Sequence, residues 1–182
     1  MMPNASAIFD LLTRIFHSLS CRYKIGLIAD LDKQSKKYSK DFWISYLLEG
    51  QLIYYPSTKK IVITFEKEKS LLRSSLSFSK RGMELSELIV FNGKLYSCDD
   101  RTGVIYQIVP QDGRSDADNS SASQEQPKPS NNKSLEVSTN SKVFKVLPWV
   151  ILMDGDGEKE KPFKCEWLAI KNHQLYAGGF GG

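Results

Sequence analysis

SELIVFNGKLYS (residues 86–97) and EWLAIKNHQLYA (residues 166–177) align without a gap, and in each an apolar run is followed by a turn and a second apolar run. In the first stretch the turn is Asn92-Gly93. Both residues accept the positive φ angles of a two-residue type I′ turn, which makes this pair a strong local signal for a hairpin. Each stretch is therefore predicted to be a β-hairpin.

The two hairpins begin 80 residues apart, or 48 residues apart when the 32 residues of the segment 111–142 are left out. A repeat of about 40 to 50 residues made of short antiparallel strands is typical of a β-propeller blade. If the runs 87–91 and 167–171 are inner strands, Ser86 and Glu166 face the central channel at equivalent places. Repetition of the blades around the axis would turn this one position into a ring of oxygen atoms. A ring of this kind suits Ca²⁺, which takes about six to eight oxygen ligands.

Most of the remaining chain also reads as strands. Apolar runs bounded by turn residues predict strands at 23–29, 51–55, 61–66, 87–91, 94–97, 104–109, 143–152, 167–171 and 174–177. The segment 111–142 has no aromatic residue and few apolar ones, so it is predicted to be a disordered insertion. The sequence thus predicts an all-β domain over 23–182, interrupted by this insertion and preceded by an N-terminal extension, residues 1–22.

Composition and charge exclude several classes of function. A net charge of +4, with lysines in scattered pairs, argues against a nucleic-acid partner. The cysteines are far apart and form no C-x-x-C motif, so neither a zinc site nor a thioredoxin-type site is supported: Cys21, Cys98 and Cys165. Residues 5–19 contain Asp10 and Arg14 and are too short to span a membrane, so they make no convincing signal peptide or transmembrane segment. Glycosylation sequons compatible with a secretory route occur at Asn4, Asn119 and Asn132.

Four longer motifs carry a family resemblance. IGLIADLD, RGMELSELIVFNGKLYSCDDRTGVIYQI, LPWVILMDGDG and FKCEWLAIKNHQLYAGG together resemble the calcium-activated nucleotidase family, the apyrases. The resemblance implies a five-bladed β-propeller with one axial Ca²⁺ that hydrolyses nucleoside di- and triphosphates such as UDP, GDP and ADP. It also implies a protein that is secreted or resides in the ER or Golgi lumen. Two axial calcium ligands of the family fall on Ser86, in RGMELS, and on Glu166, in FKCEW.

Acidic residues follow three predicted strands: Asp30 and Asp32, Asp99 and Asp100, Asp154 and Asp156. Nucleotide hydrolysis needs a carboxylate to orient or deprotonate the attacking water and a cation to hold the phosphate. The resemblance favours Asp30, Asp32 and Asp100 for the water, and Arg101 with Asp99 for the substrate. Two plainer interpretations stay open: residues 99–103 form a turn, and the DGDG loop, which lacks the spacing of an EF-hand, is a turn rather than a nucleotide-facing loop.

The remaining axial ligands of the family would lie beyond Gly182. We therefore expect about the first half of a propeller, two to three blades, which is inactive by itself and associates through an exposed edge strand or as a homodimer. The alternatives are a non-catalytic β-rich fragment or pseudoenzyme isoform, and a calcium-dependent hydrolase of another specificity, such as a lactonase or phosphotriesterase.

Overall fold

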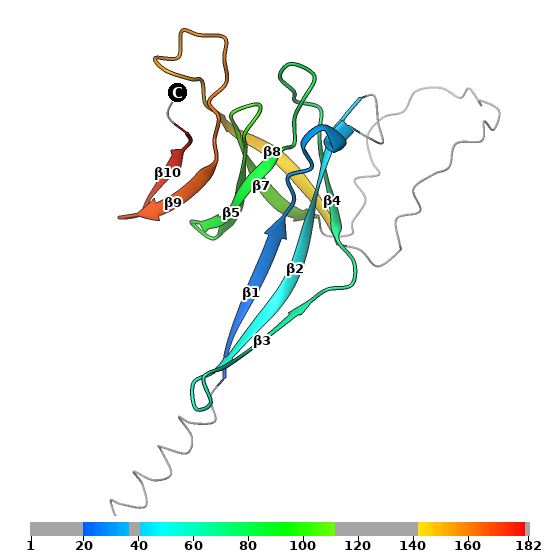
Figure 1. Ribbon diagram of the computed structural model, residues 1–182, viewed down its shortest axis with the longest axis vertical. Helices are drawn as coiled ribbons and strands as arrows, with labels where there is room; N and C mark the ends of the chain where they lie inside the picture. The colour runs from blue at the N-terminus through cyan, green and yellow to red at the C-terminus, as the bar shows by residue number, and fades with distance from the viewer. Residues whose placement is uncertain (1–19, 37–40, 112–141, 181–182) are drawn as a thin grey trace, which may run out of the picture.

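The computed structural model describes residues 20–36, 41–111 and 142–180. Within these ranges every regular element is a β-strand except the short 3-10 turn η1 (Asp32–Lys36), and all strand pairs are antiparallel. The all-β prediction is therefore confirmed. The strands form three sheets (Figure 1).

The first sheet is built on one long strand. β2 (Trp43–Tyr55) pairs along one edge with β1 (Cys21–Ile28), and along the other edge with β4 (Ser70–Ser74) and then β3 (Lys60–Phe65). The predicted strand 51–55 is only the end of β2, and β4 was not predicted. Polar residues hide the pattern in this region: Ser45 is buried within β2, where its hydroxyl donates a 2.6 Å hydrogen bond to the carbonyl oxygen of Ala29.

The second sheet is a four-stranded meander in the order β5 (Leu85–Phe91), β6 (Lys94–Asp99), β7 (Val104–Gln111) and β8 (Val143–Ile151). Gln111 pairs with Val143, so β7 and β8 are neighbours although 112–141 separates them in the chain. That segment, for which disorder was predicted, lies outside the described residues, as do the three sequons. The predicted boundary is one residue too wide at each end, since Gln111 belongs to β7 and Lys142 pairs with Glu49 and Glu66.

The third sheet is the hairpin of β9 (Trp167–Lys171) and β10 (Gln174–Gly178), and it repeats the hairpin of β5 and β6. Asn92 and Gly93 have φ angles of 48° and 73°, as a type I′ turn requires. Asn172 and His173, at the equivalent positions, have φ angles of 51° and 60°. The predicted repeat of two hairpins is therefore present in the backbone.

β7, in the second sheet, is buried on both faces along most of its length. Val104, Tyr106 and Ile108 of β7 point into a core shared with Trp43 and Leu47 of the first sheet. Ile105, between them in sequence, points to the opposite face, into a smaller core with Cys165 and Leu168. β5 correspondingly lies between β1 and β9, and β8 packs against β4 (Figure 1). This arrangement explains why β7 reads as an almost continuous apolar run.

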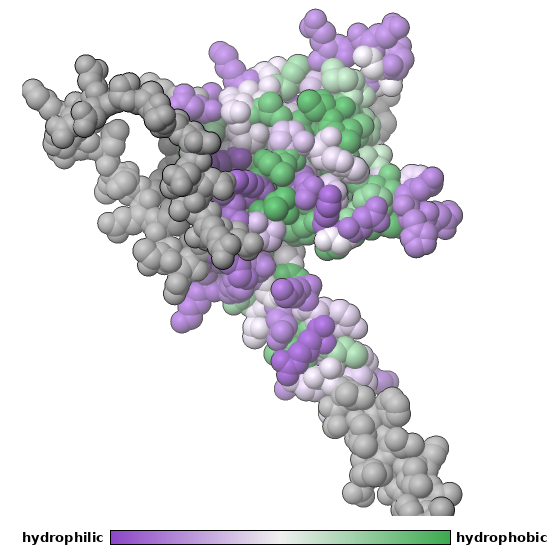
Figure 2. All heavy atoms as spheres, turned by 180° about the vertical axis from the view of Figure 1, so that it is seen from behind, coloured by the Kyte–Doolittle hydropathy of each residue, from purple (hydrophilic) through white to green (hydrophobic). Residues whose placement is uncertain are grey.

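Apolar side chains also reach the surface. Figure 2 shows hydrophobic groups across the broad part of the molecule, and β8 alone exposes Val143, Leu147, Trp149 and Ile151. In the part of the chain that the structure describes, no helix is long and apolar enough to cross a membrane.

Candidate functional site

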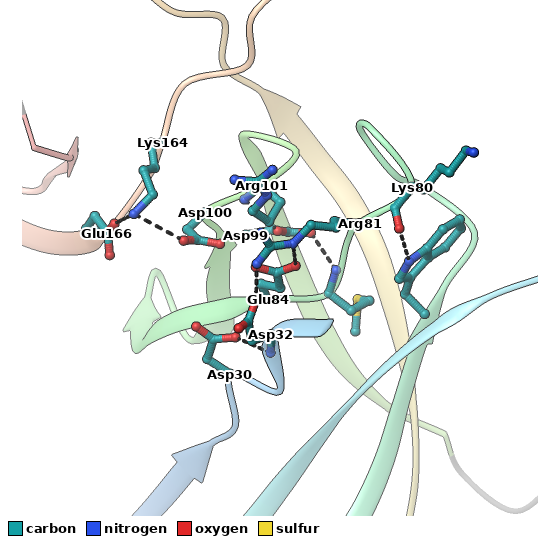
Figure 3. Close-up of polar contacts among 12 residues, drawn as sticks. Asp30, Asp32, Lys80, Arg81, Glu84, Asp99, Asp100, Arg101, Lys164 and Glu166 are labelled. Carbon is teal, nitrogen blue, oxygen red and sulfur yellow. Dashed lines mark hydrogen bonds and ion pairs between the residues drawn. The ribbon is translucent and has the colours of Figure 1, made fainter. Parts of the chain in front are cut away.

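Charged side chains from all three sheets gather at one end of the strands (Figure 3). Asp30 and Asp32 follow β1, and Glu166 precedes β9. Asp99 is the last residue of β6, and Asp100 and Arg101 follow it. The structure therefore brings together six of the residues that the sequence proposed. It adds three that were not proposed, and these lie between or beside them: Arg81, Glu84 and Lys164.

Arg81 links the loop after β1 to the segment before β5. Its Nε donates to Glu84 Oε1 at 2.7 Å and its Nη2 donates to Glu84 Oε2 at 2.6 Å, while Nη2 also contacts the carboxylate of Asp32. Burial raises the pKa of Glu84, and the paired guanidinium of Arg81 opposes that rise. The spacing of Arg81 and Glu84 in RGME was the available sequence signal, since charges three residues apart can pair within one turn of chain.

Asp99 is fully buried, with 0% of its surface exposed. Its Oδ2 accepts a 2.8 Å hydrogen bond from the N–H of Met83, and its Oδ1 accepts a 3.0 Å bond from the N–H of Arg101. Met83 has a φ of 58°, an unusual angle for a side chain of this size. This geometry is that of a carboxylate that organises a turn, the plainer of the two interpretations of residues 99–103.

Asp100 lies between Asp30 and a lysine. Its Oδ2 is 3.4 Å from Lys164 Nζ, and the same ammonium group contacts the carboxylate of Glu166. Burial raises the pKa of Asp100, the nearby charge of Asp30 raises it further, and Lys164 opposes both effects. A carboxyl group with a raised pKa beside other charged groups is the usual state of a general acid or base, although structural ion pairs also perturb pKa values.

A cavity of about 250 Å³ opens beside Asp100 and is lined by Phe78, Asp100, Arg101, Lys161, Pro162 and Lys164. Three of these six residues are cations. Asp100 Oδ1 and Arg101 Nε are buried and have no hydrogen-bond partner among the described residues. Because buried polar atoms are normally paired, these two atoms are available to a ligand or to water.

The two predicted metal ligands belong to neighbouring segments: Ser86 lies in β5, and Glu166 directly precedes β9, which contacts β5. Ser86 precedes a bulge in β5, where Glu87 has a φ of 59°, and the main-chain oxygen of Ser86 is 3.1 Å from Cys98 Sγ. Glu166 is half-buried and paired with Lys164. Nowhere in the ranges 20–36, 41–111 and 142–180 do three His, Cys, Asp or Glu residues form a metal-binding group.

The DGDG loop folds as a turn. Asp154 Oδ1 accepts from the N–H of Gly155 at 3.0 Å and its Oδ2 pairs with Lys161 at 2.7 Å. Asp156 is exposed and accepts from the N–H of Glu158 at 3.1 Å. The loop reaches the cavity through Lys161 rather than through its carboxylates.

The chain is thus an all-β protein with carboxylates and cations gathered at one end of its sheets. The apyrase family profile matches residues 31–118 and 133–182. The sequence is 45% identical over 160 residues to soluble calcium-activated nucleotidase 1 of Rattus norvegicus, covering 88% of this chain and 32% of that protein. It is 37% identical over 180 residues to an apyrase of Cimex lectularius, covering 98% of this chain and 40% of that protein.

The chain therefore belongs to the apyrase family. It spans about a third of the length of the nucleotidase of Rattus norvegicus, as it does of the Mus musculus protein of the same name, to which it is 44% identical.

Proposed function

We propose that this chain forms part of a calcium-dependent apyrase, which hydrolyses nucleoside di- and triphosphates such as UDP, GDP and ADP and releases phosphate. The observation that carries the proposal is the cavity beside Asp100, in which three cations face a carboxylate with a raised pKa. The names of the relatives support the substrate class and the calcium dependence.

The cations suit the phosphate groups. Arg101, Lys161 and Lys164 line one cavity, and the Nε of Arg101 is unpaired within the described part of the chain. Guanidinium and ammonium groups form strong charge-assisted hydrogen bonds with phosphate oxygens. In this proposal Arg101 and Lys164 hold the terminal phosphate and stabilise the charge that it carries during transfer.

Asp100 is the carboxylate best placed to handle the attacking water. Asp32 contacts Arg81, and the Oδ1 of Asp30 accepts a 2.8 Å hydrogen bond from the N–H of Asp32. Asp100 keeps one oxygen without a partner in the described residues, and its raised pKa makes it a better proton acceptor than an ordinary Asp. Asp30 and Asp32 then help to orient the water, and Asp99 shapes the turn instead of binding substrate.

Ser86 and Glu166 are the proposed calcium ligands. Both present oxygen atoms, which Ca²⁺ prefers, and a bound Ca²⁺ would neutralise charge on the phosphates. Glu166 pairs with Lys164 in this structure, and its carboxylate would help to hold a bound Ca²⁺, whereas Lys164 also lines the cavity proposed for the phosphate. Two residues supply only part of the usual six to eight calcium ligands.

The proposed setting is a five-bladed propeller of which this chain forms about the first half. The contact between β5 and β9, the first strands of the two repeated hairpins, supports this proposal because inner strands of neighbouring blades lie side by side. We further propose that the protein is secreted or lumenal and carries glycans. We also propose that the chain associates with other chains through the edge strand β10, including as a homodimer.

The test uses a chimera in which this chain replaces the matching region of the nucleotidase of Rattus norvegicus. Phosphate release from UDP and ADP is measured with Ca²⁺ and with a chelator. We expect chelator-sensitive release, and we expect Glu166→Ala and Asp100→Asn each to lower kcat by about 100-fold or more, because each removes charge that the transition state needs. Asp156→Asn is the matched control and should stay within twofold.

Three outcomes would revise the proposal. Glu166→Ala activity within twofold of the parent would remove Glu166 from the metal site. A folded chimera that releases no phosphate would favour the non-catalytic alternative, and one that hydrolyses lactones or phosphotriesters but not UDP would favour another hydrolase class. The chain by itself should show less than about 1 s⁻¹, an ordinary turnover for enzymes.

A further inference from the structure

Two cysteines meet in the core between the second and third sheets. Cys98 lies in β6 and Cys165 lies two residues before β9, and neither exposes any surface. They are separated by 67 positions in sequence, yet both belong to the same small core as Tyr96, Ile105 and Leu168. Cys21, the third cysteine, is exposed at the start of β1.

The contacts between the two residues are direct. Cys98 Sγ lies 3.4 Å from the carbonyl oxygen of Cys165, within hydrogen-bonding distance for sulfur, and each thiol is near enough to shift the pKa of the other. A disulfide needs Cα atoms about 4.4 to 6.8 Å apart, and more distant cysteines cannot be joined without moving the backbone. Cys98 Sγ contacts the main chain of Cys165, so the two cysteines are immediate neighbours in the core, as a disulfide requires.

We propose that Cys98 and Cys165 form a disulfide bond that joins the second sheet to the third. Both residues are free thiols in this structure. The bond forms by thiol–disulfide exchange while the chain folds, before the core closes over the sulfur atoms. A small-molecule disulfide such as oxidised glutathione takes up two electrons and two protons and leaves as two thiols, and one S–S bond replaces two S–H bonds.

The bond has consequences for the site, although it does not depend on the proposed activity. Cys98 Sγ contacts the main-chain oxygen of Ser86, and Cys165 directly precedes Glu166. A covalent link between the two cysteines would therefore restrain the two segments that carry these oxygen ligands. It would also explain the odd number of cysteines as one buried pair and one exposed thiol.

The test is a peptide map of the whole chain after refolding or secretion with reduced and oxidised glutathione. Free thiols are alkylated with iodoacetamide, and the protein is digested with trypsin and analysed by mass spectrometry. Trypsin places each cysteine in a separate peptide: IFHSLSCR (15–22), LYSCDDR (95–101) and CEWLAIK (165–171). We expect the second and third peptides to be joined and the first to be alkylated, and the joined species should disappear after treatment with dithiothreitol.

Variants give an independent measurement. Oxidised protein should melt about 10 °C above reduced protein, since a disulfide typically stabilises a domain by several kcal/mol. Cys98→Val, which keeps an apolar residue of similar size in the strand, should remove the difference, whereas Cys21→Ala should retain it. If Cys98→Val does not fold, the map of the parent protein decides by itself. Alkylation of both buried cysteines in the oxidised sample, or equal linkage of either to Cys21, would overturn the proposal.

Discussion

The buried carboxylate of Asp99 offers the sharpest test of how the site is held together. Asp99 accepts hydrogen bonds from the N–H groups of Met83 and Arg101, and it therefore joins the start of the segment before β5 to the turn after β6. Asp99→Ala leaves both N–H groups without this acceptor, and the bond from Met83 is buried while the bond from Arg101 is partly buried. Asp99→Asn keeps one acceptor oxygen and removes the charge.

The expected loss follows from these contacts. Each unsatisfied buried N–H group costs about 1 to 3 kcal/mol. Burial raises the pKa of Asp99, so the parent protein bears a cost for its charged carboxylate that the alanine variant avoids. We therefore expect Asp99→Ala to lower the free energy of unfolding by about 2 to 4 kcal/mol, and Asp99→Asn by about half as much.

Urea denaturation followed by circular dichroism measures this loss, and thermal melting should show a decrease in Tm of about 5 to 15 °C for a chain of this size. The matched control is Asp156→Ala, because the exposed Asp156 also accepts one backbone N–H, from Glu158. That change should cost less than about 0.5 kcal/mol. If Asp99→Ala costs no more than Asp156→Ala, the hydrogen bonds of Asp99 do not organise the turn, and a role in substrate binding regains support.

Three further changes test other parts of the structure. Asp100→Asn should raise Tm at pH 7 by roughly 2 to 4 °C, because the pKa of Asp100 is raised and its charged form is penalised above that pKa. The gain should vanish below about pH 3, where Asp100 is protonated in both the folded and the unfolded state, and an equal gain at both pH values would contradict the assignment. Replacing residues 112–141 by Asn-Gly should change the free energy of unfolding, measured by urea denaturation, by less than about 1 kcal/mol, because Gln111 and Val143 already pair across β7 and β8. A larger loss would mean that the replaced segment packs on the sheets. Gly103→Ala should lower the free energy of unfolding by about 3 kcal/mol or more, because φ is 67° and the added methyl group would overlap the carbonyl oxygen of Leu152. Gly93→Ala, where φ is 73° but the surrounding space is open, should cost about 1 kcal/mol. Equal losses in thermal melts would show that the close approach at Gly103 is relaxed.

Several features of the fold could be predicted because they are local. The Asn92-Gly93 turn follows from the conformations that these two residues tolerate, and the alternation of apolar residues predicts the strands on either side. β2 was recognised only at its end, because its buried Ser45 is paired with the carbonyl oxygen of Ala29, just after β1. Such a pairing leaves no signal in the neighbouring sequence.

The β-rich class, the repeated hairpins and the membership of the apyrase family can be identified from the amino-acid sequence, since they depend on backbone preferences and on long matching motifs. Which charged residues share a site depends instead on how the sheets pack. Asp30, Asp100 and Glu166 lie far apart in the chain and meet because three sheets pack side by side. Packing also assigned Asp99 to a turn, paired Asp100 with Lys164 and brought Cys98 against Cys165. Periodicity specifies which face of a strand is buried, but the partner on that face depends on contacts between distant segments, which no local pattern encodes.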